Sequence, residues 1–262
     1  MSVPEDHPRA ESLKIREKIV EGMHSSVVAE AGLIAHGRGE AFDYLIGEVS
    51  PELAALQQLA AVSLLLTAER PIISVNGNVA ALCAKDLVEL SELVNAPLEI
   101  NLFYRKPERE KAIEDVLKDA GYFEVLGLDP TYHTFIEELS HLRRIVDKRG
   151  IFSADVVLVP LEDGDRAMAL RKMGKKVITI DLNPLSRTSL WSNITIVNNV
   201  IRAIPEMVEL ANGLKDKDKI ELKKVIKEFN NFDTLKKTVE FMSKRLEKLS
   251  KRELVDPTRG LR

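Results

Sequence analysis

Pro71-Ile-Ile-Ser-Val-Asn-Gly-Asn-Val-Ala-Ala81 is the stretch of this sequence in which the hydrophobic period changes. Residues 72–75 form a short apolar run typical of a buried strand, and Asn76-Gly-Asn78 is a turn signal. Residues 79–94 then place apolar side chains at helical spacing. A strand, a turn and a helix in this order predict one βα unit.

The same alternation continues after this unit. Five further apolar runs predict strands, at residues 98–103, 123–128, 155–159, 177–180 and 194–197. Helical segments are predicted between most of them, at residues 108–120, 166–173 and 200–210. Strands and helices that alternate in this way predict an α/β fold, with a mostly parallel sheet and helices on both of its faces.

Helices are predicted at both ends of the chain. Before Pro71, the expected helices begin at Pro8, continue in residues 27–34, start again at Glu40, and end in a buried helix at residues 53–66. After Leu214, a heptad seam formed by Leu235, Val239, Met242, Leu246 and Leu249 follows a shorter helix, and this pattern predicts a helical hairpin. We therefore expect an α/β domain with N-terminal helices at residues 1–213 and a charged helical extension at residues 214–262.

The charge balance argues against nucleic acid as a partner, because the net charge of the 262 residues is only −3. The segment 215–262 has 15 basic and 9 acidic residues, a net charge of +6. Solvated Lys and Glu faces on helices that pack back onto the domain are favoured over a dimer contact or a surface for anionic partners. A single cysteine, no signal-like N-terminus and no long apolar run indicate a cytoplasmic protein without a membrane span.

Candidate site residues follow predicted strands, because parallel sheets bind ligands beyond the carboxyl ends of their strands. The loop 181–188, Asp-Leu-Asn-Pro-Leu-Ser-Arg-Thr, offers an acid and an amide for a base or ribose and a hydroxyl and a guanidinium for phosphate. Asn76-Gly-Asn78 could bind an anion or be an ordinary turn, and Asn198-Asn199 could contact adenine or cap a helix. Glu162-Asp-Gly-Asp165 could hold Mg²⁺, although capping of the next helix by Asp165 is the favoured interpretation.

Arg38 lies between Gly37 and Gly39 at an expected helix start, where backbone amides and the helix dipole would favour an anion. Gly37-Arg-Gly39 is not a dinucleotide fingerprint, because Phe42 stands where the third glycine belongs. No P-loop is present, and the five histidines show no paired metal spacing. These absences remove the main support for an oxidoreductase and for a P-loop enzyme.

Several blocks of the sequence are considered together: His7–Arg9, Arg16–Ile19, Glu21–Met23, Ala31–Tyr44, Val75–Ala81, Glu99–Arg105, Val159–Arg166 and Val177–Arg187. In this order they resemble archaeal phosphopantothenate synthetase, also called 4-phosphopantoate beta-alanine ligase. The resemblance extends from about His7 to Leu210, and the charged segment after Leu214 lies outside it. It implies a homodimeric, Rossmann-like enzyme of coenzyme A synthesis that condenses 4-phosphopantoate with beta-alanine and converts ATP to AMP and diphosphate.

The resemblance also implies an ATP site. Its residues would be Arg16, Arg38, Asp181, Leu182, Asn183, Ser186, Arg187, Thr188, Asn198 and Asn199. Arg16, Arg38 and Arg187 would neutralise the triphosphate and stabilise the departing diphosphate, with Mg²⁺ as the partner and an acyl adenylate as the simplest intermediate.

The residues for the other substrates are less defined. Asn76, Asn78 and Asn101 could orient phosphopantoate or beta-alanine, and Lys106, Arg105 or an arginine of the ATP site could bind the substrate phosphate. Glu162, Asp163 and His36 are candidates for the base that deprotonates the amine.

Two other classes of function fit the same loops. A nucleotide-dependent kinase or transferase would release ADP and not AMP. A non-enzymatic nucleotide sensor would bind ATP without turnover and would need residues 215–262 for its output, whereas a ligase would keep most of its activity without them.

Overall fold

Residues 71–75 form a buried strand, β1 (Pro71–Val75), in the computed structural model, which describes residues 10–252. β1 belongs to a five-stranded sheet with the order β2-β1-β5-β6-β7, in which every pair of neighbours is parallel. The other strands are β2 (Leu98–Ile100), β5 (Val156–Pro160), β6 (Lys176–Ile180) and β7 (Ile194–Ile196). The predicted α/β fold with a mostly parallel sheet is thereby confirmed.

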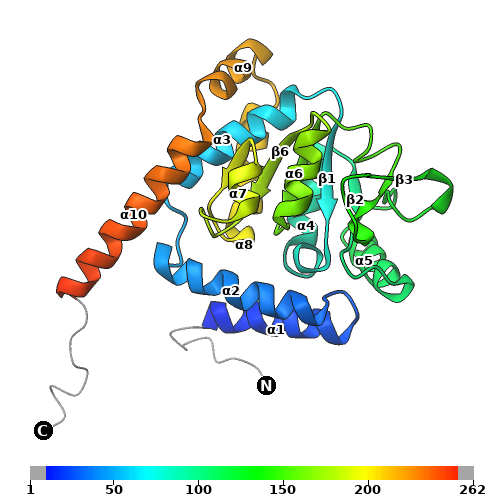
Figure 1. Ribbon diagram of the computed structural model, residues 1–262, viewed down its shortest axis with the longest axis horizontal. Helices are drawn as coiled ribbons and strands as arrows, with labels where there is room; N and C mark the ends of the chain where they lie inside the picture. The colour runs from blue at the N-terminus through cyan, green and yellow to red at the C-terminus, as the bar shows by residue number, and fades with distance from the viewer. Residues whose placement is uncertain (1–9, 253–262) are drawn as a thin grey trace, which may run out of the picture.

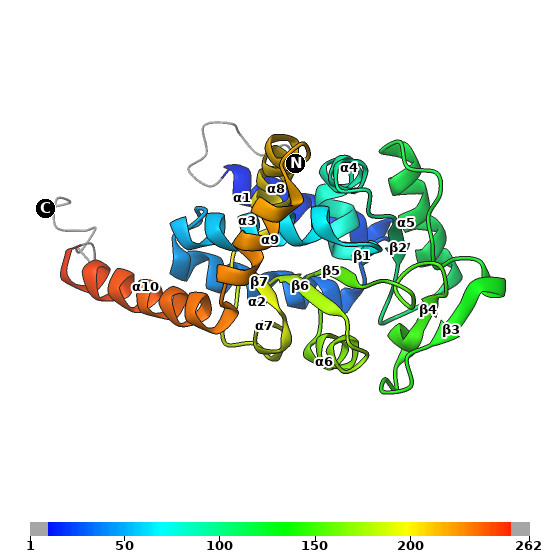
Figure 2. The same ribbon diagram turned by 90° about the horizontal axis from the view of Figure 1, so that it is seen from above.

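Helices cover both faces of this sheet (Figure 2). One face carries α3 (Glu52–Thr67), α4 (Gly77–Leu93) and α8 (Val200–Leu214), and the other carries α6 (Gly164–Lys172) and α7 (Arg187–Trp191). The strand residues alternate accordingly, since Ile73 and Leu158 join the core under α4 and α8, whereas Ile72 and Val157 join the core under α6. Successive residues of a strand point to opposite faces of the sheet, so their side chains form two cores, one on each face. α5 (Pro107–Asp119) packs against α4 and β2.

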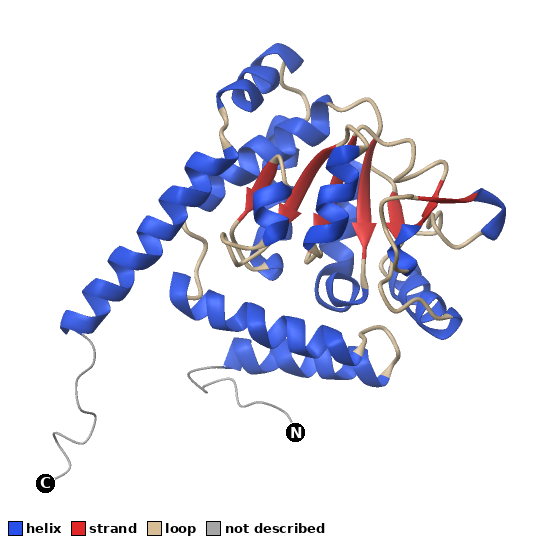
Figure 3. Ribbon diagram, viewed as in Figure 1, coloured by secondary structure: helices blue, strands red, loops and turns tan. Residues whose placement is uncertain are grey.

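The N-terminal helices α1 (Ala10–His24) and α2 (Glu30–Ile46) lie across the carboxyl ends of the strands (Figure 1). The strand arrows in Figure 3 point toward this pair. α2 is one continuous helix, so the expected helix start at Gly37-Arg-Gly39 is wrong. Two glycines of α2 do not break the helix but let it pack closely against its neighbours. A Cβ atom on Gly32 would overlap the Asn78 side chain, and one on Gly39 would touch Leu182.

The expected strand at residues 123–128 is wrong, and the run 98–103 is a strand only up to Ile100. Leu126 alone bridges to Glu99, and Gly127 then turns the chain away with a φ of +88°. Pairing ends there because this left-handed conformation cannot continue a strand.

Between Gly127 and β5 the chain makes an excursion that the hydrophobic pattern did not predict. It contains η1 (Pro130–Tyr132), β3 (His133–Phe135), η2 (Leu142–Arg144) and β4 (Ile145–Asp147), and β3 pairs antiparallel with β4.

Two helices end the described chain, α9 (Lys219–Glu228) and α10 (Asn231–Arg252). Both helices of the expected hairpin are present, but their principal contacts are with the α/β body and not with each other: α9 packs on α3, and α10 packs on α2, α3 and β7. Leu222, Leu235 and Met242 are buried there. The expected packing of these charged helices back onto the domain is therefore observed, while the far half of α10 projects outward (Figure 1).

Candidate active site

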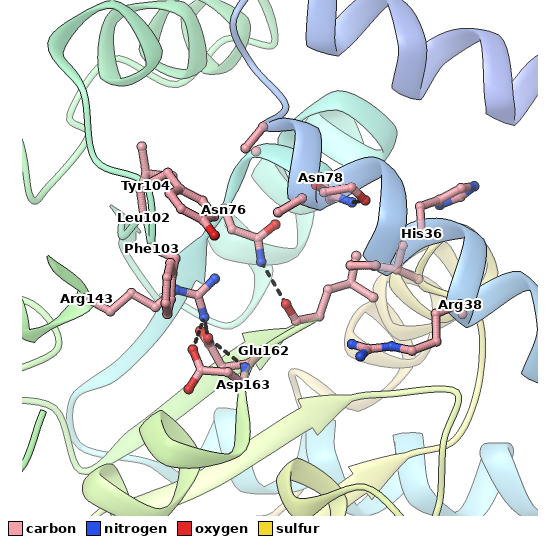
Figure 4. A pocket seen from close by; sticks show the side chains of 18 of the residues that line it. His36, Arg38, Asn76, Asn78, Leu102, Phe103, Tyr104, Arg143, Glu162 and Asp163 are labelled. Carbon is pink, nitrogen blue, oxygen red and sulfur yellow. Dashed lines mark hydrogen bonds and ion pairs between the residues drawn. The ribbon is translucent and has the colours of Figure 1, made fainter. Parts of the chain in front are cut away.

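A cavity of about 560 Å³ lies between α2 and the carboxyl ends of the strands. Its walls come from α2, from the N-terminus of α4, from the loops after β2, β5 and β6, and from the start of α8 (Figure 4). The centre of the cavity lies where β1 meets β5, which is the point where the strand order reverses direction. Open parallel sheets bind ligands at this point, as the sequence led us to expect.

Asn76 holds the loops of β1 and β5 together. Its Oδ1 accepts the Val79 N–H at 3.1 Å as the N-cap of α4, and its Nδ2 donates to the Pro160 carbonyl at 2.8 Å. A Cβ atom at Gly77 would overlap the Val27 carbonyl oxygen, so a glycine is needed for the approach of α1 and its loop. Asn78 also lines the cavity and donates to the Gly32 carbonyl of α2 at 2.9 Å. The two asparagines therefore fix the cavity's shape.

Asn101 and Lys106 do not line this cavity. Asn101 is buried and donates to the carbonyls of Arg143 and Ile145, at 3.2 and 2.9 Å. It thereby positions the η2 segment. Lys106 is exposed at the start of α5. Arg105 pairs with Glu110 at 2.5 Å and donates to the Gly127 carbonyl.

A chain of buried ion pairs follows β5. Glu162 pairs with Arg166, which is fully buried, and with Arg143 of η2. Asp163 accepts from Arg143 Nη1 at 3.0 Å and also caps α6 by accepting the Arg166 N–H at 2.9 Å. Asp163, and not the expected Asp165, is the cap of this helix. Burial lowers the pKa of both Arg143 and Arg166 to about 10, so each remains charged at neutral pH.

The expected metal role of Glu162 and Asp163 stays a prediction. Both carboxylates are already engaged by guanidinium groups, which a metal ion would have to displace. Within residues 10–252 no group of three or more His, Cys, Asp and Glu side chains is arranged to hold a metal ion. The protein itself thus offers no ready metal cage in that part of the chain.

The loop after β6 is held by its own side chains. Asp181 accepts the Asn183 N–H at 2.9 Å and the Ser186 hydroxyl at 2.5 Å. Burial raises the pKa of Asp181, while these hydrogen bonds and the charge of Arg38 oppose the rise. Ser186 in turn caps α7 by accepting the Ser189 N–H. Of this loop, Leu182 lines the cavity.

Arg187 and Thr188 begin α7, next to the loop after β5. Thr188 donates its hydroxyl to the Glu162 carbonyl at 2.9 Å, which joins the β5 and β6 loops. Arg187 is exposed and pairs with Asp165 at 2.7 Å. It does not line the cavity, whereas Arg38 does.

Asn198 and Asn199 precede α8, and only Asn199 lines the cavity. Asn199 lines the cavity, caps α8 and donates to Asp43 of α2 at 2.7 Å. Arg202 joins the same carboxylate, so this cluster ties α8 to α2. Asn198 is buried outside the cavity, where it donates to Ser50 at 2.9 Å.

His36, Arg38 and Glu40 line the cavity from α2. Burial lowers the pKa of His36, which keeps its ring neutral at neutral pH. Arg16 of α1 does not line the cavity, but its Nε donates to Glu40 at 3.1 Å, and this bond raises the pKa of Arg16. Arg16 therefore acts on the cavity through Glu40.

Phe103, Tyr104, Arg109 and Arg143 also line the cavity, and sequence reasoning did not assign them to it. Arg109 donates to the carbonyls of Tyr104 and Val27, at 2.5 and 3.0 Å. The aromatic pair follows β2 directly, so the rule that ligands bind after strands could have found it. Arg109 lies on a helix and Arg143 in the excursion, where no sequence signal placed them.

The sequence matches a known protein family. The family model described as Phosphopantothenate/pantothenate synthetase matches residues 53–245. The match continues into α10, so the expectation that the resemblance ends before the charged helices is wrong. No helix in residues 10–252 is long and apolar enough to cross a membrane.

Several curated relatives carry the name 4-phosphopantoate–beta-alanine ligase. The protein of Thermococcus onnurineus is 54% identical over 251 residues, and that of Thermococcus kodakarensis is 53% identical, each alignment covering 95% of both chains. The protein of Methanosarcina mazei is 50% identical over 95% of this chain and 97% of its own. This chain therefore belongs to the phosphopantothenate/pantothenate synthetase family.

Proposed function

We propose that this chain is an ATP-dependent ligase that condenses 4-phosphopantoate with beta-alanine to 4'-phosphopantothenate, in coenzyme A biosynthesis, and releases AMP and diphosphate. The observation that carries the proposal is the high identity over nearly the whole of both chains to ligases of that name. The cavity supports it, since polar and cationic groups surround a space of about 560 Å³ at the point of the sheet suited to a nucleotide.

The nucleotide is assigned to the end of the cavity formed by α2, β6 and the start of α8. Arg38, Leu182 and Asn199 line this end, and Arg16 supports it through Glu40. The hydrogen bonds of Asp181, Asn183, Ser186 and Thr188 hold the loop around it, and Asn198 positions the start of α8. Arg187 would reach the phosphates once its ion pair with Asp165 breaks. This ion pair is exposed, so water can replace Asp165 as the partner of Arg187.

The need to activate the carboxylic acid of the substrate explains why arginine side chains would be required at the nucleotide end. A carboxylate resists attack by an amine, so its oxygen first attacks the α-phosphorus of ATP, the bond to diphosphate breaks, and an acyl adenylate forms. Arg38 and Arg187 would stabilise the negative charge that grows on the leaving diphosphate. Mg²⁺ would arrive with ATP and neutralise part of the triphosphate charge. The amine then attacks the acyl carbon and AMP leaves.

The amine of beta-alanine must lose a proton before it can attack. His36 lines the cavity, and its burial favours the neutral ring that can accept this proton. The carboxylates of Glu162 and Asp163 are already engaged by the guanidinium group of Arg143. We therefore assign the base to His36. Asn76 and Asn78 would orient the acid and the amine from the N-terminus of α4, while Asn101 and Lys106 would act from outside the cavity.

The decisive experiment incubates the purified chain with ATP, Mg²⁺, 4-phosphopantoate and beta-alanine and measures AMP, ADP and diphosphate. Formation of AMP that depends on both small substrates supports the ligase. ADP would indicate the alternative kinase or transferase, and tight ATP binding without turnover would indicate the nucleotide sensor.

A homodimer in a cytoplasmic location is part of the same proposal, and light scattering of the purified chain measures the oligomeric state.

Arg38→Gln tests the nucleotide end. Loss of one guanidinium that contacts the transferred charge costs roughly 10²–10³ in kcat. Arg171→Gln serves as the control, because Arg171 lies in the last turn of α6, away from the cavity lining. An unchanged kcat in Arg38→Gln would contradict the assignment of Arg38 to the leaving group.

A further inference from the structure

A second cavity, of about 520 Å³, lies between α3 and α8, apart from the candidate active site. The two helices pack against each other on one face of the sheet (Figure 2). Residues three or four apart share one face of a helix, and each helix contributes such a set to the cavity. We name this cavity the α3–α8 groove. Its lining consists of Ser50, Pro51, Glu52, Ala55 and Gln58 before and on α3, and of Glu206, Glu209, Leu210, Gly213 and Leu214 on α8.

The charge of the α3–α8 groove is negative and uncompensated. Glu52, Glu206 and Glu209 line it, and its lining contains no lysine or arginine. Within residues 10–252, none of these three carboxylates forms an ion pair with a basic side chain. Carboxylates that face one space repel one another, and a cation between them would turn this repulsion into attraction. The groove therefore favours a positively charged ligand.

Glu206 is held in place by neutral groups. It accepts the Ser50 hydroxyl, the Gln58 amide at 2.6 Å and the Asn198 amide at 3.2 Å. These three donors fix the position of the carboxylate, but none of them carries a positive charge that would neutralise it. A carboxylate fixed in this way can bind an ammonium group without first losing side-chain freedom, and charge-assisted hydrogen bonds are the stronger kind.

Gln58 independently points to a ligand with N–H donors. The residue is only 2% exposed and lines the groove, and its Nε2 donates to Glu206. Because only the amide nitrogen can donate to a carboxylate, the Oε1 atom is the acceptor that remains. This oxygen accepts no hydrogen bond from any group of residues 10–252. An unpaired acceptor on a buried side chain is costly unless a ligand or water supplies the donor.

The remaining walls of the groove are apolar. Pro51, Leu210 and Leu214 contribute them, and a Cβ atom at Gly213 would meet no atom of residues 10–252 within 4 Å, so the groove is open there. A bare metal ion fits such walls poorly, since it needs several oxygen ligands around it. No group of three or more His, Cys, Asp and Glu side chains in residues 10–252 is arranged to hold one. Ammonium groups joined by methylene carbons match both the carboxylates and the apolar walls.

We propose that the α3–α8 groove is a binding site for a small aliphatic amine with two or more ammonium groups. One ammonium group donates to Glu206 and to Gln58 Oε1, a second meets Glu52 or Glu209, and the methylene chain lies on the apolar walls. The site is separate from the candidate active site and is independent of the ligase reaction. Because the ligand bridges α3 and α8 of the folded chain, its binding also raises the stability of the folded state.

Isothermal titration calorimetry of the full chain tests the proposal with 1,4-diaminobutane and spermidine as probes. At least one of them should bind with a Kd below about 1 mM. The Glu52→Gln/Glu209→Gln double variant should weaken this binding at least about 10-fold. Glu89→Gln/Glu124→Gln is the matched control, because it removes the same charge at two exposed glutamates outside the groove, and its Kd should stay within about 2-fold of wild type.

A second variant tests the groove without a change of charge. Ala55 is exposed on α3, so Ala55→Trp should fold, and its ring would fill the groove and weaken binding at least about 10-fold. The melting temperature of wild type should rise by at least about 3 °C at 100 times the Kd of the amine, and that of Ala55→Trp should not.

The proposal is overturned if neither amine binds, or if Ala55→Trp binds as tightly as wild type. Equal losses of affinity in the two double variants would also overturn it, because they would show general attraction to a negative surface. Two further titrations complete the test. 1,4-Butanediol has the same carbon chain without charge, and Mg²⁺ has the charge without the chain, so binding of either as tight as that of the diamine would contradict the assigned ligand.

Discussion

Arg166 shows how single residues hold the site from behind. Its side chain is fully buried between β1 and the loop after β5, where it pairs with Glu162 and donates to the Ser74 hydroxyl at 3.0 Å. Glu162 in turn engages Arg143, whose guanidinium reaches the cavity. A charge at the cavity wall is thus oriented by a buried charge that does not line the cavity.

Arg166→Met should therefore destabilise the fold by about 3 kcal/mol, because removal of one partner leaves Glu162 buried with a single guanidinium. Urea unfolding followed by circular dichroism measures this loss. Lys118→Met is the control, since Lys118 pairs with Glu114 at a more exposed site on α5 and its loss should be much smaller. Equal stabilities of Arg166→Met and wild type would mean that Arg143 alone neutralises Glu162.

Glu99 gives a prediction about pH. It is completely buried at the sheet edge and accepts the N–H groups of Asp147 and Ile151, at 3.0 and 2.6 Å. Burial raises its pKa from 4.5 to about 7, so the folded state binds this proton more tightly than the unfolded chain does. The stabilisation is complete below about pH 4.5 and is lost as the pH rises through about 7.

Comparison of wild type with Glu99→Gln isolates this contribution. The difference in unfolding free energy between the two proteins should depend on pH between about 4.5 and 7, with wild type losing stability relative to the variant as the pH rises. Denaturant titrations at several pH values give the difference. A difference that is constant across this window would show that Glu99 has an ordinary pKa in the folded protein.

At the scale of elements, α2 shows why the sequence predicted some helices wrongly. Glycine lowers helix propensity by about 1 kcal/mol, so Gly37 and Gly39 favoured a break. In the structure Gly39 instead allows α2 to lie against Leu182, and Gly32 leaves room for Asn78. Contacts with residues distant in the chain outweigh the low helix propensity of glycine here. These contacts cannot be predicted from the local sequence pattern.

The strands that were predicted correctly share one property. β1, β5 and β6 are runs of five residues that are buried along almost their whole length, and a continuous apolar run is the signal of such strands. Residues 123–128 are similarly apolar, yet Phe123 is 71% exposed and Gly127 ends the pairing. The polar hairpin β3–β4 gave no such signal and was missed.

Asn231 connects α10 to the sheet. Its Oδ1 accepts the Thr195 N–H of β7 at 2.8 Å, and its Nδ2 donates to the carbonyls of Ser189 and Ser192. Asn231→Ala leaves a buried N–H and two buried carbonyls without this partner, so it should cost roughly 2–3 kcal/mol of stability. Chemical denaturation measures it. Asn212→Ala, at an exposed position of α8, is the control and should be close to neutral.

At the scale of the whole molecule, the candidate site combines segments from most of the chain. Sequence reasoning expected Asn76, Asn78 and the loops after β5 and β6 at the edge where the ends of parallel strands meet, and residues from all of these segments line the cavity, together with His36 and Arg38 of α2. It could not place Arg109 and Arg143, since their approach depends on how α5 and the excursion between Gly127 and β5 pack beside the strand ends. The assignment of individual residues to substrates stays a prediction.

The C-terminal helices α9 and α10 are packed against the rest of the molecule. Met242 of α10 packs with Ile46 of α2 and with Leu182, which lines the cavity. Leu222 and Leu235 are also buried. The sequence led us to expect that a ligase would keep most of its activity without residues 215–262, but this packing predicts the opposite outcome.

Deletion of residues 215–262 should therefore lower both stability and kcat/KM, because it removes Met242 from beside Leu182 and exposes the apolar surface under α9 and α10. Deletion of residues 247–262 is the matched control, since it keeps Met242, and also Arg245, whose guanidinium lies against Gly47 at the end of α2. Thermal unfolding and AMP formation should separate the two truncations, with the shorter deletion close to the full chain. Full activity after the longer deletion would show that α2 keeps its place over the strand ends without support from α10.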